Sequence, residues 1–216
     1  GLLLVLPRNP GAYLETLRQH RFPQVLIDHR GLDEETPAVA ATNRQGAYDA
    51  TKYLAELGHQ RIGFITGTMD QRCAQDRLEG YKAALADHGA AFDPELVREG
   101  NFFQPLGYTG ASALLELPHP PTAIFASNDI SAFGVMEAVR EHNLHIPEDV
   151  SVVGFDDIPQ AAHVHPPLTT VRQPLEEMGR IATRMLLEYI EGPQRPIKRV
   201  ELPTELVIRQ SCCSPG

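Results

Sequence analysis

The sequence predicts an α/β fold built on parallel sheets. Short apolar runs alternate with segments of helical periodicity, and Gly or Pro commonly separates one from the next. This alternation is typical of βαβ units, in which a crossover helix joins two parallel strands. At 216 residues the chain is long enough for one large domain or for two lobes with separate cores.

The predicted elements follow one another in a regular order. We expect strands at 1–7, 24–28, 38–42, 61–67, 95–100, 122–129 and 151–157, the first two apolar enough to be covered on both faces. Helices are expected around Leu14 and Leu17 and at 43–58, 74–89, 108–117, 130–143 and 174–192. The stretch 158–173 has no periodicity and is predicted to be irregular. Residues 199–210 read as a final extended segment, in which Pro203 indicates a break or an edge position.

Composition narrows the class of protein. Hydrophobic residues make up 42% and charged residues 22%, and no apolar run approaches the length of a membrane span. The net charge of −9 disfavours binding of nucleic acid by this chain alone. Cys73 stands alone and Cys212 and Cys213 are adjacent, which fits neither a disulfide framework nor a zinc site. We therefore expect a reducing compartment, the cytoplasm.

Polar residues follow several predicted strands at their carboxyl ends, where open parallel sheets bind ligands. Asn128 and Asp129 end one strand, and Asp156 and Asp157 end another. The ordinary interpretation of Asp129 is a helix cap. Asp156 has no helix directly after it, so a hydrogen bond to a ligand or to another loop is the better interpretation.

Arg77 and Phe102 are further candidate ligand-binding residues, and each also has a purely structural interpretation. Arg77 lies at the edge of the buried face of its helix. It is either a solvated helix arginine or a guanidinium that presents paired donors to adjacent oxygens. Phe102 follows a short strand and either closes the core, which the residue type favours, or offers a flat face to a ligand.

Motifs for catalysis, cofactors and metals are not found. The sequence has no GxSxG, no GxxxxGK[ST] and no HExxH, and nothing resembles a nucleophile with an adjacent base. His163 and His165 lack a third ligand at useful spacing. We therefore predict no enzyme, no cofactor and no metal.

Several blocks together resemble the effector-binding core of the LacI/GalR family of bacterial transcriptional regulators. They are "ELGHQRIGFITG", "DRLEGYKAAL", "AIFASNDISAFGVMEAV", "PEDVSVVGFDDIPQAAHVHPPLTTVRQPLEEMG" and "LPTELVIRQSC", in the family's order. The resemblance implies two Rossmann-like lobes of the periplasmic-binding-protein type I. It divides the chain into a first lobe of 1–42 and 173–200 and a second of 43–172 and 201–213.

The resemblance also implies roles for particular residues. Positions like Arg77, Asn128 and Asp156 bind the effector in such proteins, and an aromatic residue at the place of Phe102 packs on it. Asp28 corresponds to a cleft position of the first lobe, and Gln71 and Cys73 to loop positions that vary with the effector. Leu175 stands where some sugar-responsive relatives carry an aromatic residue.

The chain departs from the family at its start. Such regulators begin with a helix-turn-helix, and we expect that segment and about the first 60 residues of the effector core to be missing, which leaves the first lobe incomplete. The expected function is the effector-binding and homodimerisation region of a repressor. Its effector is a sugar or polyol, with a purine or a phosphorylated metabolite as other candidates, and operator DNA is bound through the absent segment. A secreted solute-binding protein is the alternative, and a sugar-processing enzyme would need a catalytic pair that is not found.

Overall fold

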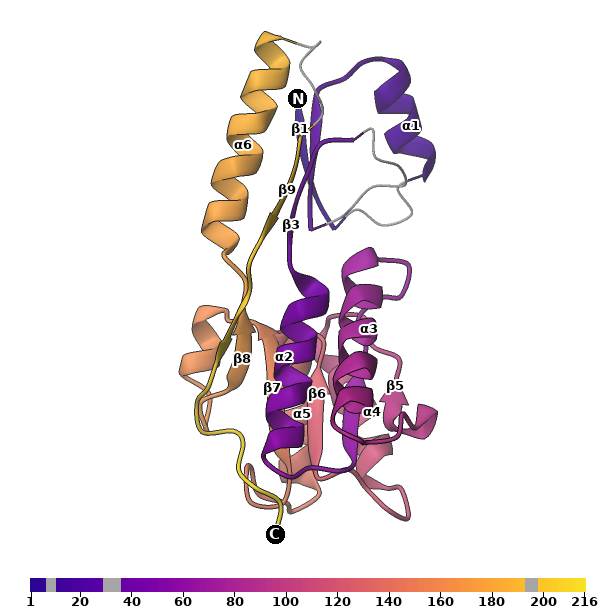
Figure 1. The fold of residues 1–216 in the computed structure, drawn as a ribbon, viewed down its shortest axis with the longest axis vertical. Coiled ribbons are helices and arrows are strands. Elements are labelled where there is room, and N and C mark those ends of the chain that lie inside the picture. Colours follow the sequence, from indigo (N-terminus) through magenta and orange to yellow (C-terminus); the bar gives the residue numbers. More distant parts are fainter. Residues whose placement is uncertain (7–10, 29–35, 193–197) are drawn as a thin grey trace. The chain divides into compact units, whose positions relative to one another are not determined.

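The computed structural model describes residues 1–6, 11–28, 36–192 and 198–216, and it confirms an α/β fold with parallel sheets (Figure 1). The chain forms two compact units. Unit 1 comprises Gly1–Thr42, Asp70–Cys73 and Pro174–Pro203, and unit 2 comprises Asn43–Met69, Ala74–Gln173 and Thr204–Gly216. The lobe boundaries inferred from the sequence, after 42, 172 and 200, stay a prediction.

Unit 1 is built on a parallel sheet in the order β1 (Leu2–Val5), β2 (Gln24–Ile27), β3 (Ala38–Ala41) and β9 (Arg199–Leu202). Helix α6 (Leu175–Glu191) buries Met178, Ala182, Met185 and Tyr189 against Val25, Val39 and Ala41. Helix α1 (Gly11–Gln19) packs Leu14 against Leu26 and Ala38. Because neighbouring strand residues such as Val25 and Leu26 point to opposite faces, the two helices cover opposite faces of the sheet.

Strand β1 is less covered than the sequence predicts. Leu2 and Leu3 are more than a third exposed, and Val5 is 63% exposed. The physical reason is its position at the edge of the sheet, where β2 is its only paired neighbour among the described residues. The prediction that this strand is covered on both faces was therefore wrong.

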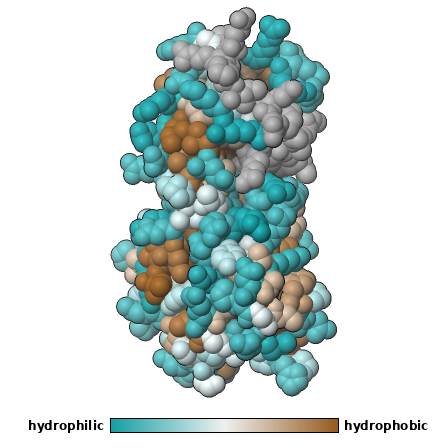
Figure 2. Space-filling view, in the orientation of Figure 1, coloured by the Kyte–Doolittle hydropathy of each residue, from teal (hydrophilic) through white to brown (hydrophobic). Residues whose placement is uncertain are grey.

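The visible face of each unit carries separate apolar patches within a mostly polar surface (Figure 2).

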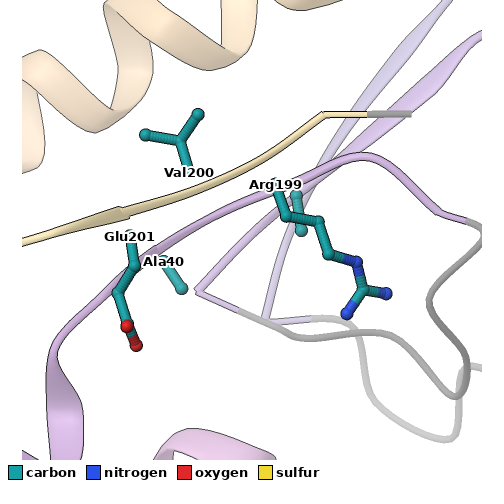
Figure 3. A pocket seen from close by; sticks show the side chains of 5 residues that line it. Ala40, Arg199, Val200 and Glu201 are labelled. Carbon is teal, nitrogen blue, oxygen red and sulfur yellow. The ribbon is translucent and has the colours of Figure 1, made fainter. Parts of the chain in front are cut away.

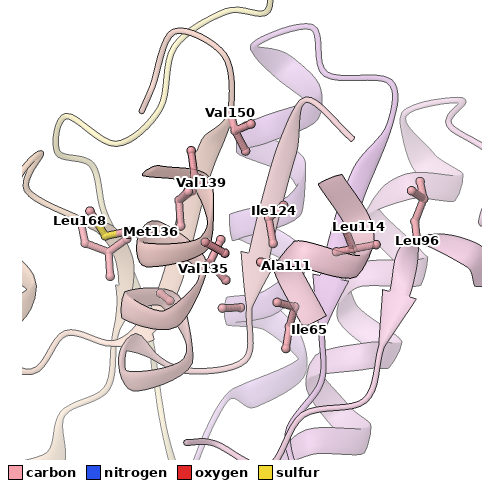
Figure 4. Close-up of a cluster of buried hydrophobic side chains, with 14 of the residues drawn as sticks. Ile65, Leu96, Ala111, Leu114, Ile124, Val135, Met136, Val139, Val150 and Leu168 are labelled. Atoms are coloured by element: carbon pink, nitrogen blue, oxygen red, sulfur yellow. The ribbon is translucent and has the colours of Figure 1, made fainter. Parts of the chain in front are cut away.

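Unit 2 holds the larger sheet, in the order β10, β8, β7, β6, β4 and β5, with β10 antiparallel to its neighbour. These strands span Glu205–Val207, Thr169–Arg172, Ser151–Asp156, Ala123–Ala126, Ile62–Ile65 and Val97–Arg98. Helices α2 (Asn43–Glu56) and α3 (Arg72–Asp87) pack on one face through a core that includes Leu54, Phe64 and Tyr81. Helices α4 (Gln104–Leu115) and α5 (Asp129–Glu141) pack on the other (Figure 4).

Two segments differ from the sequence-based expectation. The stretch predicted to be irregular contains a 3-10 helix, Pro159–Ala162, and strand β8. This strand could not be recognised from the sequence, because its buried residues Thr169 and Thr170 are polar and the apolar run expected of a covered strand is absent. The final extended segment breaks at Pro203, as expected, and its two halves join different sheets as β9 and β10.

Every helix in the described part of the chain is too short or too polar to cross a membrane.

Glycines allow α4 and α5 to touch along their backbones. A Cβ at Gly107 would lie 2.2 Å from the carbonyl oxygen of Ser131, and a Cβ at Gly134 would lie 2.2 Å from that of Gln104. Backbone atoms cannot move aside as a flexible side chain can. The helix pair therefore requires glycine at both positions.

We predict that Gly134→Ala destabilises the protein by about 1–3 kcal/mol, because the added methyl group must push the two helices apart. The control is Gly179→Ala in α6, where nothing lies within 4 Å of the added Cβ. That change should stabilise by about 0.5–1 kcal/mol through helix propensity. Denaturant unfolding of both variants checks this, and equal effects of the two changes would contradict it.

Candidate functional site

The candidate site lies at the carboxyl end of the unit 2 sheet. Strand β6 runs into Ser127 and Asn128, and β7 ends at Asp156. Phe102 lies just beyond β5, and Arg77 projects from α3. This is the edge at which open parallel sheets bind ligands, and four of the predicted site residues share it.

Arg77 is the buried centre of this group. It is 2% exposed, so the interpretation as a solvated helix arginine was wrong. Its Nε donates a hydrogen bond to Asn43 Oδ1 at 2.8 Å, and a terminal nitrogen donates to the Ser127 carbonyl. The same nitrogen lies 3.8 Å from Asp156 Oδ1. The guanidinium also stacks on the ring of Phe155, 3.7 Å from its centroid.

The Phe102 ring borders the guanidinium on another side. Its centroid lies 5.7 Å from the Arg77 guanidinium carbon, and the residue is half-buried. A Cβ at Gly67 would lie 1.9 Å from the ring, so only glycine leaves room for it. Phe102 has a positive φ of 67°, and Asn128 Nδ2 donates to its carbonyl oxygen at 3.0 Å. The ring is thus part core and part surface, rather than the fully buried residue that the residue type favours.

Asn128, not Asp129, caps helix α5. The Asn128 Oδ1 accepts a hydrogen bond from the Ser131 N–H at 2.9 Å. The interpretation of Asp129 as the cap was therefore wrong, because the helix begins one residue earlier than that role requires. Asn128 is 7% exposed and orders both the helix start and the Phe102 loop.

Asp129 joins three chain segments instead. Its Oδ2 accepts a hydrogen bond from the Ile158 N–H at 2.9 Å, and its Oδ1 accepts one from Thr170 Oγ1 at 2.5 Å. Burial raises the pKa of Asp129 to about 7, with the charge of Asp156 adding to the rise and the two hydrogen bonds opposing it. The group therefore exchanges its proton near neutral pH, next to a predicted effector residue.

Asp156 and Asp157 form a turn with unusual backbone geometry. Their φ angles are 115° and 56°, in the region that favours glycine. Asp157 accepts hydrogen bonds from Arg172 Nε at 2.7 Å and from Arg209 at 2.5 Å. Asp156 accepts one from Gln173 Nε2 at 2.7 Å and keeps its side chain 22% exposed. Asp157 thus anchors the turn, while Asp156 stays partly accessible.

The other predicted site residues belong to unit 1. Asp28 follows β2, is 7% exposed and has a φ of 55°. Gln71 is 3% exposed and its Nε2 lies 3.4 Å from the Leu6 carbonyl oxygen, while the Cys73 thiol lies 4.0 Å from Gln71 Oε1. Leu175 begins α6 and is 47% exposed. Effector contacts by these residues stay a prediction.

A separate hollow in unit 1 lies beside β3 and β9 (Figure 3). Its volume is about 200 Å³, and it is lined by Ala38, Ala40, Arg199, Val200 and Glu201. None of the predicted site residues lines it.

The structure adds Asn43, Ser127 and Gln173 to the group around Arg77 and Asp156. Each of them had one recognisable signal, a polar residue at an expected strand end or in the run before Pro174. Among the described residues, no three His, Cys, Asp or Glu side chains are placed to hold a metal ion.

The sequence model of the family described as periplasmic binding protein-like domain matches residues 51–212. The chain belongs to this family. The HTH-type transcriptional repressor CytR of Escherichia coli strain K12 is 37% identical to this periplasmic-binding-protein-like chain over 212 residues, which are 98% of the chain and 62% of CytR. The repressor PurR of Vibrio atlanticus is 35% identical over 212 residues, 98% of the chain and 64% of that protein.

Solved structures agree with this membership. A LacI family transcriptional regulator from Mycobacterium smegmatis superposes with a TM-score of 0.91 at 29% identity, covering 100% of this chain and 80% of that one. A complex of the transcriptional regulator CelR with cellobiose has a TM-score of 0.92 at 35% identity, covering 98% and 65%. The resemblance to the effector-binding domain of LacI-family regulators is thereby confirmed. The chain spans less than two thirds of the length of the curated relatives named above.

We predict that Asp129→Asn removes a pH dependence of stability. A carboxyl whose pKa is raised keeps its proton in the folded state up to about pH 7, while the unfolded chain loses it near pH 4. Wild-type stability should therefore fall by up to about 1.4 kcal/mol per pH unit from this group as the pH rises through that interval. Asparagine can still accept from Ile158 and donate to Thr170.

The measurement is the denaturant midpoint of both proteins between pH 4 and 8. The stability of Asp129→Asn relative to wild type should rise with pH up to about pH 7 and then stay level. A difference independent of pH would show that Asp129 is ionised throughout.

Proposed function

We propose that this chain is the effector-binding and dimerisation region of a bacterial ligand-responsive transcriptional regulator, and that its effector is a neutral sugar or polyol. The observation that carries the proposal is the buried Arg77, which lies 3.8 Å from the partly exposed carboxylate of Asp156 at the carboxyl end of the unit 2 sheet. A buried cation that lies beside both an aromatic ring and an accessible anion is suited to a polar uncharged ligand.

The charges and polar groups support this effector class. Arg77 and Asp156 carry opposite charges and balance each other, so a neutral ligand adds no uncompensated charge. The Asp156 carboxylate accepts hydroxyl hydrogens, Asn128 can both donate and accept, and Phe102 offers an apolar surface. A phosphorylated metabolite would bring charge that this pair does not neutralise, and a purine would depend more on the ring of Phe102.

The effector residues proposed in unit 2 are Arg77, Asn128, Asp156 and Phe102. Asp28, Gln71 and Cys73 of unit 1 are proposed as further contacts on the strength of the family resemblance alone. We expect the effector to favour one arrangement of the intact protein over another, because a ligand shifts an equilibrium only through different affinities for its two states.

The regulator is favoured over a secreted solute-binding protein. CytR and PurR, named above, are transcriptional repressors. We expect a cytoplasmic homodimer that binds operator DNA through a helix-turn-helix segment of the intact chain. The exposed Leu187 and Ile190 of α6 are apolar residues of the kind that subunit interfaces bury.

The full-length protein tests this function directly. In gel retardation with DNA from upstream of its own gene, we expect saturable binding that changes when a neutral sugar which also stabilises the protein is added. Light scattering on the same sample should give the mass of a dimer. A monomer that binds no DNA but binds a sugar tightly would favour the solute-binding alternative.

We predict that Asp156→Asn weakens effector binding by about 1–3 kcal/mol, or roughly tenfold to a hundredfold, because a hydroxyl acceptor becomes an N–H donor. Asp157→Asn is the matched control. It should lower the melting temperature by a few degrees, because Arg172 and Arg209 lose the negative charge that both of them contact, and leave affinity nearly unchanged. Calorimetry with the effector measures both. If Asp157→Asn abolishes binding while Asp156→Asn does not, the roles are reversed.

A further inference from the structure

The C-terminal tail, Ser211–Cys213, is bound to the end of the unit 2 sheet that lies opposite the candidate site. The Val152 N–H donates to the Ser211 carbonyl oxygen at 2.8 Å, and Ser211 Oγ donates to the Val152 carbonyl oxygen at 2.6 Å. The Thr169 N–H donates to Ser211 Oγ at 2.8 Å. The tail thus joins the amino ends of β7 and β8, whereas the candidate site lies at the carboxyl end of the sheet.

His59 holds the last residue of this tail. The side chain follows α2 and is 1% exposed. Its Nε2 lies 2.9 Å from the Cys213 carbonyl oxygen and 3.1 Å from Ser151 Oγ, and its Nδ1 lies 2.8 Å from Thr122 Oγ1. Ser151 Oγ also accepts a hydrogen bond from the Cys213 N–H at 3.0 Å. One buried imidazole therefore connects the tail with the residues at the starts of β6 and β7.

The hydrogen-bond partners determine where the neutral ring carries its hydrogen. A carbonyl oxygen can only accept, so Nε2 carries the hydrogen and donates it to Cys213, while Nδ1 accepts the hydroxyl hydrogen of Thr122. A second proton on Nδ1 would force the Thr122 hydroxyl to turn away. It would also place a positive charge among three partners that are all uncharged. The docked tail therefore requires the neutral ring.

Other titratable groups lie on the elements around the ring. They are Tyr53 of α2, Arg61, His119, Glu148, and Cys212 and Cys213 of the tail. Arg61 pairs with Asp93 at 3.3 Å. Burial lowers the pKa of His59, the hydrogen bond to Cys213 opposes that shift, and the charges of these neighbours are not among its causes.

We propose that His59 is an acid-sensitive latch, which holds the C-terminal tail on the unit 2 sheet while the ring is neutral and releases it when the ring is protonated. Once the tail leaves, water reaches the ring and its pKa returns to the ordinary value. Protons therefore favour the released tail, and the tail is held less firmly as the pH falls below about 6.5. This latch does not depend on the proposed function.

The thiol of Cys212 measures release of the tail. It donates to the Val152 carbonyl oxygen at 3.3 Å, and burial raises its pKa to about 12, so it reacts slowly while the tail is docked. The full-length protein is treated with iodoacetamide between about pH 5 and pH 8, and mass spectrometry gives the rate at each cysteine. Dividing the rate in urea-unfolded protein by the native rate at the same pH gives a protection factor in which ionisation of the free thiol cancels.

We expect the protection of Cys212 to fall by up to about tenfold per pH unit below about pH 6.5. Cys73 of α3 is the internal control, because it is 2% exposed and lies outside the tail. Its protection should change by less than about threefold over the same range. An equal fall at both cysteines would overturn the proposal, because the whole protein would then be opening.

Two variants separate the titrating group from the bonds it makes. In His59→Gln the amide can donate to Cys213 and accept from Thr122 without titrating, so the protection of Cys212 should not depend on pH. Ser151→Ala removes a hydroxyl that bonds to Cys213 but keeps the imidazole. It should lower protection about fivefold at every pH and retain the slope below about pH 6.5.

Protection of Cys212 that is constant with pH in wild type would overturn the proposal. The same slope in His59→Gln would also overturn it, because another group would then be titrating. A second measurement decides if that variant does not fold. Exchange of the His59 C2 hydrogen, followed by mass spectrometry, should have a midpoint at lower pH in the native protein than in urea, and a higher midpoint would overturn the proposal.

Discussion

The buried guanidinium of Arg77 constrains the site end of unit 2 more than any other group. A cation removed from water is tolerated only where acceptors and an opposite charge surround it. Asn43, the Ser127 carbonyl and Asp156 supply these from the start of α2 and from the ends of two neighbouring strands. Phe155 covers one face of the planar group. The helix start and both strand ends are therefore held at fixed distances from one point.

The turn after β7 follows from the same requirement. Asp156, which lies 3.8 Å from Arg77, and Asp157 after it both have a positive φ. That strain persists because surrounding groups oppose its release. Arg172 and Arg209 donate hydrogen bonds to Asp157, and Gln173 donates one to Asp156. The Ile158 N–H donates to the carboxylate of Asp129. The geometry of the accessible carboxylate is thus fixed by neighbours that need not touch a ligand.

Buried polar groups around this turn also set the pKa of Asp129. Asp129 has a pKa of about 7 because its burial outweighs its two hydrogen bonds, and the charge of Asp156 contributes to that value. Neutralising the charge of Asp156 would lower the pKa of Asp129, since the effect between two charges is mutual. Gly154 is required at the same place, because a Cβ there would lie 2.3 Å from Asp129 Oδ1.

The sequence by itself determined the alternation of strands and helices, the family and the candidate residues at the strand ends, because these depend on local periodicity and on short motifs. It could not distinguish a solvated Arg77 from a buried one, since both lie at the edge of a helix face and only the packing of α3 decides. Strand β8 was not predicted, because two of its buried residues are threonines. The helix cap was assigned to Asp129, whereas Asn128 is the cap. Gln173 and Asn43 gain their roles only when distant segments meet Asp156 and Arg77, and such pairings are set by the tertiary fold, not by local sequence.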